Sequence, residues 1–300
     1  MFKKIIALVI IALLVAAGLI AMTSGSEPDV VVGSKHFTEQ KILGEMVAQL
    51  LEAKTDLRVG RRIGLGSTMI SFGALQEGDI DVYPEYTGTG LVSILNRDYD
   101  PSQDPGDVLQ FVRKRFGEKW NLRWLAPLGF GNTYAYAMRE GQAKELGIRT
   151  VSDLEEYRDR LKPGFDHEFL ERPEYKRFDE VYGFRFEKEV VRLDPDVMYR
   201  AIKNKEVDVI DAFATDGRIA AYDLRVLEDD ENLFPPYDAC LLVRNDALEE
   251  FPQIKPVLEQ LDGRITTKEM QNMNYAVTDE MRSPSAVARE FLEKEGLIDS

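Results

Sequence analysis

The sequence is poor in the residues that most often carry enzymatic or metal chemistry. It contains one cysteine, Cys240, and two histidines, His36 and His167, among 300 residues. A single cysteine excludes an internal disulfide. There is no HExxH, GxSxG, P-loop or CxxC motif, and no group of Asp and Glu has calcium-loop spacing. We therefore predict no catalytic residue, no metal site and no cofactor.

Basic residues are scarce relative to acidic ones. The chain has 38 Lys and Arg against 53 Asp and Glu, so its formal net charge is −15. A chain this acidic is repelled by a polyanion, which argues against nucleic acid as a partner. The hydrophobic content of 44% is ordinary for a globular protein with a core, and the length suggests about two domains.

A long apolar run opens the chain. It extends without interruption from Ile5 to Met22 and follows Lys3 and Lys4. Lysines before an apolar segment are typical of a secretory signal, and they stay on the cytoplasmic side of the membrane. The length of about 18 residues also reaches the threshold for crossing a bilayer. We expect residues 1–28 to form a signal peptide or an N-terminal membrane anchor plus a linker, with the rest of the chain outside the cytoplasm.

From residue 29 onward, expected strands alternate with expected helices. A buried-type strand over Val30–Val32 precedes FTEQKILGEMVAQLLEAKTD, which has the apolar periodicity of a helix that Thr38 can cap. Ser152 and Glu155 have capping-box spacing. In LDPDVMYRAI, Asp194 is the expected cap and Pro195 the first helical residue. The alternation predicts an α/β fold with largely parallel sheets.

Two segments far apart in the chain resemble each other. DVYPEYTG begins at Asp81 and reaches Tyr86 five residues later, and DVIDAFAT begins at Asp208 and reaches Phe213 five residues later. Each is expected to be a strand that ends in an aromatic ring beside Thr or Gly. The repetition predicts two similar lobes, each with a ring at the carboxyl end of a strand, where α/β sheets bind ligands.

Other candidates for chemistry are weaker. Asp79 and Asp81 face the same side of an expected strand and could act as an acid–base pair, although a role at the strand entry is favoured. The two histidines are expected at the surface or at caps. Trp120 and Trp124 have helix-like spacing and are expected to pack in the core.

Aromatic residues at strand ends are the stronger functional signal. Tyr86, Tyr134, Phe213 and Tyr237 all lie at expected strand ends or beside turn residues. A quaternary ammonium has no N–H to donate, so only aromatic faces and carbonyl oxygens can recognise it. Four rings at equivalent topological places are the physical means of holding such a cation.

The ordered motifs of the chain resemble those of the glycine betaine/choline/carnitine-binding proteins of osmoprotectant ABC importers. The resemblance covers nearly all of residues 29–297. It is carried by GSKHFTEQ, GDIDVYPEYTGTG, GNTYAYAM, FDHEFLER, VDVIDAFATDG, FPPYDA and SPSAVAREFL. It implies a two-lobe periplasmic-binding-protein fold of type II-like topology, with the ligand in the inter-lobe cleft. Lobe one would comprise residues 29–130 and 233–300, and lobe two residues 131–232.

The resemblance also implies a binding site. The rings that hold the ligand cation would be Tyr86, Tyr134, Phe213 and Tyr237, and Asn132 would offer its backbone carbonyl. The ligand carboxylate would be met by Lys35, Thr89 and Arg172. Relatives usually carry tyrosine where this chain has Phe213, which keeps the aromatic face and removes a hydroxyl. The site is therefore expected to exist with an altered ligand preference.

The implied function is extracytoplasmic capture of a quaternary ammonium solute for transport, without turnover. The ligand would be glycine betaine, proline betaine, choline or carnitine, and a monomeric binder would deliver it to an ABC permease driven by a separate ATPase subunit. Three alternatives remain open. The first is a binder of another small molecule, such as an amino acid that Arg172 alone recognises. The second is an exported acid–base enzyme, and the third is a structural or adhesive protein.

Overall fold

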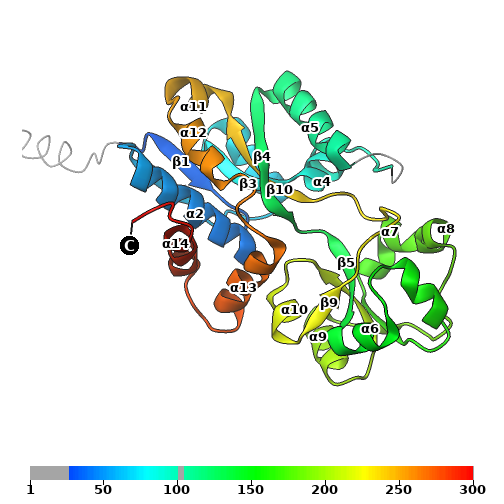
Figure 1. Ribbon diagram of the computed structural model, residues 1–300. Helices are drawn as coiled ribbons and strands as arrows, with labels where there is room; N and C mark the ends of the chain where they lie inside the picture. The colour runs from blue at the N-terminus through cyan, green and yellow to red at the C-terminus, as the bar shows by residue number, and fades with distance from the viewer. Residues whose placement is uncertain (1–26, 101–104, 300) are drawn as a thin grey trace, which may run out of the picture.

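The computed structural model describes residues 27–100 and 105–299, which form two lobes, each built on a five-stranded sheet (Figure 1). The strand order is β2-β1-β3-β10-β4 in one sheet and β7-β6-β8-β5-β9 in the other. Lobe one denotes the part built on the first sheet, and lobe two the part built on the second. The predicted α/β fold is confirmed.

Lobe one contains both ends of the described chain. Its strands are β1 (Val30–Gly33), β2 (Val59–Arg62), β3 (Val82–Tyr86), β4 (Leu122–Gly131) and β10 (Asp238–Arg244). Its helices are α2 (Thr38–Lys54), α3 (Thr68–Glu77), α4 (Thr87–Thr89), α5 (Pro105–Trp120), α11 (Asn245–Glu250), α12 (Ile254–Leu258), α13 (Thr267–Thr278) and α14 (Pro284–Lys294). A π-helical turn covers Gly90–Ile94 and a 3-10 turn covers Glu259–Leu261.

Lobe two is formed by the middle of the chain. Its strands are β5 (Tyr134–Arg139), β6 (Pro163–Asp166), β7 (Val191–Leu193), β8 (Val209–Phe213) and β9 (Leu224–Val226). Its helices are α6 (Glu140–Leu146), α7 (Pro173–Lys176), α8 (Phe178–Tyr182), α9 (Pro195–Lys203) and α10 (Gly217–Ala221). Two 3-10 turns cover Ser152–Tyr157 and Phe169–Glu171.

The two sheets have the same topology. In lobe one, β1 pairs in parallel with β2 and β3, while β10 pairs antiparallel with β3 and β4. In lobe two, β6 pairs in parallel with β7 and β8, while β5 pairs antiparallel with β8 and β9. Strand β3 thus corresponds to β8, and these are the two segments that resemble each other in sequence. The predicted similarity of the lobes is confirmed.

One reversed strand in each sheet departs from the largely parallel prediction. Strand β5 follows directly after the chain leaves lobe one, and β10 follows directly after the chain returns from lobe two (Figure 1). Each of these strands enters its sheet from the opposite lobe, so it runs against its neighbours. The two crossings lie side by side, because the Asn132 amide donates to the Tyr237 carbonyl at 3.0 Å.

The repeated aspartates have equivalent structural roles. Asp81 accepts a hydrogen bond from the Val31 amide at 2.8 Å, and Asp208 accepts one from the Lys162 amide at 3.0 Å. Asp81 thereby joins the start of β3 to the start of β1, and Asp208 joins the start of β8 to the start of β6. The expected role at the strand entry is confirmed for Asp81, whose other neighbour is Arg244 at 3.6 Å.

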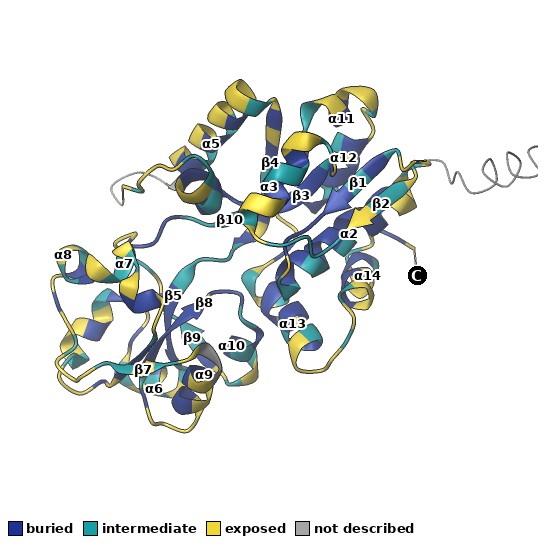
Figure 2. Cartoon of the chain, turned by 180° about the vertical axis from the view of Figure 1, so that it is seen from behind, coloured by how far each residue is buried: buried dark blue, intermediate teal, exposed yellow. Residues whose placement is uncertain are grey.

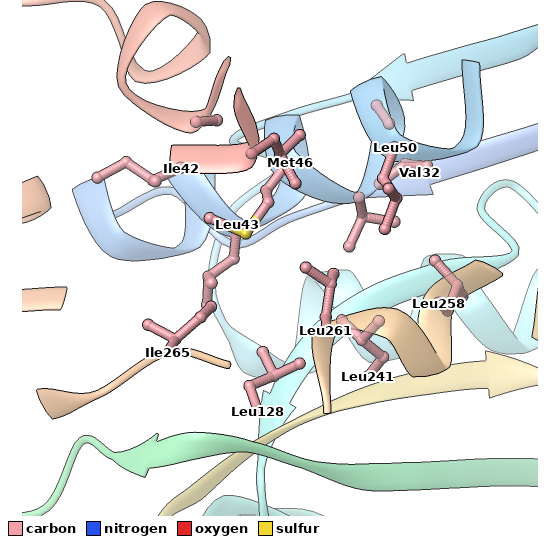
Figure 3. Close-up of a cluster of buried hydrophobic side chains, with 14 of the residues drawn as sticks. Val32, Ile42, Leu43, Met46, Leu50, Leu128, Leu241, Leu258, Leu261 and Ile265 are labelled. Carbon is pink, nitrogen blue, oxygen red and sulfur yellow. The ribbon is translucent and has the colours of Figure 1, made fainter. Parts of the chain in front are cut away.

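The core of lobe one depends on the apolar face of α2. Ile42, Leu43, Met46 and Leu50 are fully buried, and Figure 3 shows them among side chains from β1, β4, β10 and the C-terminal segments: Val32, Leu128, Leu241, Leu258, Leu261 and Ile265. Burial of each such side chain contributes about 1.5–3 kcal/mol. Figure 2 shows the strands mainly buried, and the outer helices with alternating buried and exposed residues.

The helix starts were predicted less well than the helices themselves. Thr38 does not cap α2, because it is already the first helical residue and Phe37 occupies the cap position. Ser152 forms no capping box. Asp153 accepts the Arg149 and Thr150 amides at 2.8 and 2.9 Å and closes the turn there instead. Asp194 occupies the cap position ahead of Pro195 but forms no capping hydrogen bond with its side chain.

The tryptophans pack as expected, although not from one helix. Trp120 ends α5 and Trp124 lies in β4, and both rings contact Phe116, with centroids 4.9 and 5.2 Å away. Their spacing therefore reflects a helix followed by a strand. Among residues 27–100 and 105–299, no helix is long and apolar enough to cross a membrane. The apolar run over residues 5–22, predicted as signal or anchor, lies outside the described residues.

We predict that Asp211, in the middle of β8, makes folding stability depend on pH. Its side chain is 3% exposed, and burial raises its pKa to about 7. The folded state therefore binds this proton more tightly than the unfolded state, so the stability present below pH 4 is lost as pH rises toward 7. Asp211→Asn cannot ionise, and at pH 8 it should be more stable than the wild type by up to about 4 kcal/mol.

Urea unfolding at pH 4 and pH 8 measures this difference. The gain should be small at pH 4 and should grow between pH 4 and 7. Asp79→Asn changes an exposed aspartate just ahead of β3 and serves as the control for the loss of one carboxylate. A gain for Asp211→Asn that stayed constant with pH would contradict the prediction.

Candidate functional site

The four predicted aromatic residues lie at strand ends, and these ends are on the side of each lobe that faces the other lobe. Tyr86 is the last residue of β3, and Phe213 is the last residue of β8. Tyr134 is the first residue of β5, and Tyr237 immediately precedes β10. Because β3 corresponds to β8 and β10 corresponds to β5, the rings form two equivalent pairs, one from each lobe. Phe213 is 43% exposed, which is unusual for a large apolar side chain.

Three of the predicted residues form a contiguous group with Arg172. The rings of Tyr134 and Phe213 are 4.5 Å apart between centroids, and the Arg172 guanidinium lies 4.5 Å from the Tyr134 centroid. Burial raises the pKa of Tyr237, and Arg172 opposes this shift, so Tyr237 lies close to the same guanidinium. Burial also raises the pKa of Tyr134 to about 12. Both phenols therefore stay neutral near pH 7.

Tyr86 and Lys35 form a second group in lobe one. The Lys35 ammonium lies 5.2 Å from the Tyr86 ring centroid. It also forms a buried ion pair with Glu85, whose other oxygen accepts a hydrogen bond from Tyr83 at 3.1 Å. Lys35 is only 4% exposed. The ammonium predicted to meet a ligand carboxylate thus already has one carboxylate partner within the chain.

Arg172 has a similar internal partner. Its Nε and Nη2 donate to the two oxygens of Glu174 at 3.1 and 2.8 Å. Lys35 follows β1 and Arg172 follows β6, which are corresponding strands. In each lobe, therefore, a cation that follows the second strand in the sheet order, β1 or β6, lies over an aromatic ring and pairs with a glutamate.

The turn that contains Thr89 packs directly against Tyr237. A Cβ on Gly88 would lie 2.9 Å from the Tyr237 ring and 2.9 Å from the Pro236 carbonyl, so only glycine fits there. Thr87 donates to the Pro236 carbonyl at 2.8 Å and accepts the Asp238 amide at 3.1 Å. Thr89 lies half-buried at the end of this turn. The motif YTGT therefore joins two of the predicted site segments.

A cleft of about 630 Å³ lies between the lobes beside these groups. Lobe one contributes Phe37, Thr38, Glu39, Asn274, Thr278 and Asp279 to its wall. Phe213, Thr215, Asp216, Gly217 and Arg218 come from lobe two, and Asn132 comes from the crossing segment. Of the eight predicted site residues, Asn132 and Phe213 line this cleft. This volume lies within the range of small-molecule sites, about 300–1,000 Å³.

Glu39 lies at the centre of this region, and its role was not predicted. The carboxylate is 3% exposed and accepts hydrogen bonds from Tyr86 Oη at 2.5 Å, Asn132 Nδ2 at 3.1 Å and Asn274 Nδ2 at 3.0 Å. Burial raises the pKa of Glu39, and the hydrogen bonds oppose that rise. The only sequence signal was its place in the first turn of α2, where the helix dipole favours an anion.

Helix α13 connects the lobes next to the cleft. Gln271 Nε2 donates to the Ala214 carbonyl at 2.7 Å, and Asn274 Nδ2 donates to the Thr215 carbonyl at 2.8 Å. Figure 1 shows α13 of lobe one beside α10 of lobe two. The helices approach closely because residue 217 is glycine: a Cβ there would lie 2.5 Å from the Tyr275 amide nitrogen. No local pattern in the sequence indicated this contact.

The remaining candidates for chemistry lie elsewhere. His36 is exposed and contacts the Gly66 carbonyl at 3.0 Å, and His167 is also exposed. Asp79 is exposed, whereas Asp81 is held at the strand entry. Within the described part of the chain, no three His, Cys, Asp or Glu side chains are grouped to hold a metal ion.

Comparison with known proteins identifies relatives over the whole length. The model of a family described as the substrate binding domain of ABC-type glycine betaine transport systems matches residues 28–294. The chain is 36% identical over 308 residues to the carnitine transport binding protein OpuCC of Listeria monocytogenes, covering 100% of this chain and 99% of the relative. It is 35% identical over 284 residues to the ergothioneine transport permease/ergothioneine binding protein EgtU of Helicobacter pylori, covering 94% of this chain and 50% of that relative.

A solved structure is similar throughout. A crystal structure described as a glycine betaine/carnitine/choline ABC transporter has a TM-score of 0.86 and 34% sequence identity, covering 90% of this chain and 100% of the other. The predicted two-lobe substrate-binding fold is thereby confirmed.

We predict that Gly217→Ala destabilises the contact between α10 and α13. The added methyl group would meet backbone atoms of Tyr275, which cannot rotate away as a side chain can. Overpacking of this kind costs about 1–3 kcal/mol of folding stability. Urea unfolding should show this loss. Gly141→Ala, in α6 with nothing near its added Cβ, is the control and should be neutral or stabilising. Equal stability changes in the two variants would contradict the prediction.

Proposed function

We propose that this chain, which belongs to the family of substrate-binding domains of ABC-type glycine betaine transport systems, captures a trimethylammonium carboxylate in the cleft between its lobes. Carnitine, glycine betaine and ergothioneine, which the relatives' names mention, share these two groups. The proposed lobes are residues 29–130 with 233–300 and residues 131–232. Closure of the lobes would surround the ligand, and a permease with its ATPase subunit would receive it.

The observation that carries this proposal is the convergence of aromatic rings and cations at four strand ends. The Arg172 guanidinium lies over Tyr134 and interacts with Tyr237, and the Phe213 ring contacts Tyr134. Tyr86 faces the Lys35 ammonium. Within the chain, each of these two cations already lies over an aromatic face. The faces are therefore electrostatically suited to a positive group, and a trimethylammonium gains about 0.5–2 kcal/mol from such a face.

The carboxylate end of the ligand is assigned to Lys35, Thr89 and Arg172. Lys35 and Arg172 follow corresponding strands of opposite lobes, so a carboxylate that contacts both would bridge the cleft. Arg172 uses its Nε and Nη2 for Glu174, and a guanidinium has five N–H donors, so donors remain for a ligand. Lys35 would share its ammonium between Glu85 and the ligand. Asn132 would offer its backbone carbonyl to the cation.

The alternatives fit the geometry less well. A primary ammonium, as in an amino acid, needs several acceptors, whereas the groups around Arg172 are mostly aromatic faces. The acid–base pair that the sequence suggested, Asp79 and Asp81, does not line the cleft, and Asp81 is bonded to the Val31 amide. An adhesive protein would have no need of a cleft with buried polar groups. A binder without turnover is the function that the site supports best.

We predict that Arg172→Ala separates ligands by their carboxylate. Glycine betaine should lose about 1.5–3 kcal/mol of binding free energy, because a charge-assisted hydrogen bond is removed. Choline has no carboxylate and should be affected far less. Calorimetric titration of the full chain with both ligands measures the difference. Arg177→Ala, five residues further along the chain, is the charge-matched control and should bind both ligands normally. Equal weakening of the two ligands by Arg172→Ala would refute the carboxylate assignment.

The same titration examines the four strand-end rings of Tyr86, Tyr134, Phe213 and Tyr237, which we call the aromatic cage. Tyr134→Ala and Tyr86→Ala should each weaken glycine betaine and choline alike, since both ligands present the same trimethylammonium. Phe213→Tyr should retain binding because the aromatic face is kept. If the Tyr134 and Tyr86 variants bound glycine betaine normally, the proposal that these rings hold the trimethylammonium group would be wrong.

We predict that the chain from residue 29 onward lies outside the cytoplasm. Lys3 and Lys4 should remain inside, and the apolar run from Ile5 would be either cleaved or kept as a tether. Protease added to intact spheroplasts should degrade the protein, while a cytoplasmic marker is protected. N-terminal sequencing then distinguishes a tethered chain from a mature form that starts near residue 25. Protection of the protein until the cells are lysed would contradict the expected location.

A further inference from the structure

The lobe-one wall of the cleft carries an aromatic ring that the proposed site does not include. Of the described residues, Phe37 and Phe213 are the aromatic ones that line the cleft, and they come from opposite lobes. Phe37 is half-buried, whereas Tyr86 is only 4% exposed and does not line the cleft. A ligand in the cleft therefore meets the aromatic surface of lobe one at Phe37.

The rings beside Phe37 hold it in place. It stacks on Tyr86, with the ring centroids 6.3 Å apart and the planes 20° apart, and the His36 ring lies 6.1 Å away at 84° to it. Phe37 also packs against the apolar core of lobe one. Its orientation is thus set before a ligand arrives, which lowers the entropic cost of binding.

Phe37 is locally unfavourable at the position that it occupies. It is the cap residue of α2, with an extended backbone and no capping hydrogen bond from its side chain. Ser, Thr, Asp and Asn are strongly preferred there, because their side chains accept a free amide of the first turn and an aromatic ring cannot. Departures from such local rules are expected at functional sites. The residue type therefore indicates a role in the cleft and not in the helix.

The charges around the cleft favour a cation beside these rings. Asp216 is paired with Arg218 at 2.7 Å, and Asp279 presents an exposed carboxylate at the same cleft. The N-terminus of α2 carries a partial positive charge, which Glu39 in its first turn opposes. The cleft is therefore negative on balance and attracts a positive group.

We infer that Phe37 is a fifth ring of the ligand site, which contacts the ligand cation from lobe one while Phe213 contacts it from lobe two. This inference rests on the proposed function and deepens it, because it assigns a specificity-determining residue that the family resemblance did not indicate. Tyr86, which stacks on Phe37, supports the ring. Since the two rings belong to different lobes, a cation that contacts both binds the closed state more tightly and shifts the lobes toward closure.

The test compares glycine betaine with 3,3-dimethylbutanoate, which has the same shape and carboxylate but a neutral tert-butyl group in place of the trimethylammonium. Calorimetric titration of the full chain should show that the wild type prefers glycine betaine. Phe37→Leu keeps an apolar side chain and removes the aromatic face, so it should lower this preference by about two- to thirtyfold. The affinity for 3,3-dimethylbutanoate should change little.

Phe111→Leu is the matched control. It makes the same change at a ring of α5 that is 38% exposed and does not line the cleft, so the full preference should remain. Phe37→Tyr keeps the aromatic face and should keep the preference as well. Loss of the preference in either of these variants, as complete as in Phe37→Leu, would show that the inference is wrong. If Phe37→Leu does not fold, Phe37→Ser, which supplies a polar cap to α2, is measured in its place with the same expected loss.

The remaining outcomes separate this inference from the proposed function. An unchanged preference for glycine betaine in Phe37→Leu would overturn the inference and leave the proposed function intact. Equal weakening of both ligands would also overturn it, because Phe37 would then act by packing alone. If the wild type bound neither glycine betaine nor choline, or did not distinguish glycine betaine from its neutral analogue, the proposed function itself would be overturned.

Discussion

The double crossing of the chain between the lobes is the constraint on which the site depends. The segments on either side of Asn132 and Tyr237 run next to each other and are joined by a backbone hydrogen bond of 3.0 Å. Because each crossing delivers a reversed strand into the opposite sheet, the strand end at Tyr134 lies beside that at Phe213, and the strand end at Tyr237 lies beside that at Tyr86. Asn132, Tyr134 and Tyr237 thus belong both to the segments that connect the lobes and to the proposed site. Any rotation of one lobe about these crossings also moves the aromatic rings relative to one another.

Charged side chains near the cleft are the second feature of the proposed site, and three of them have partners within the chain. Lys35 pairs with Glu85, and Arg172 pairs with Glu174, while Glu39 is satisfied by three neutral donors. Burying an ion without such partners costs several kcal/mol. These arrangements keep the cations in place over the aromatic faces before a ligand arrives, so binding requires an exchange or sharing of partners and little rearrangement. A preorganised site of this kind loses less conformational entropy on binding.

Local patterns predicted the elements and the equivalence of the lobes, but they did not predict contacts between distant segments. The similarity of DVYPEYTG and DVIDAFAT correctly identified β3 and β8, because each must end in a ring at the same edge of its sheet. The family resemblance identified Lys35 and Arg172 as site residues, but it did not indicate their ion pairs with Glu85 and Glu174. Glu39 and Asn274 are 235 residues apart, so no sequence window contains both. Capping was mispredicted at Thr38 and Ser152, since a capping residue is defined by a backbone conformation that the residue types alone do not determine.

A crystal structure of the full chain with bound carnitine would show where the cation lies. We expect the trimethylammonium nitrogen within about 6 Å of the ring centroids of Tyr134 and Phe213, with the carboxylate toward Arg172. A trimethylammonium group in contact with carboxylates alone, away from all four strand-end rings, would contradict the recognition mode described above.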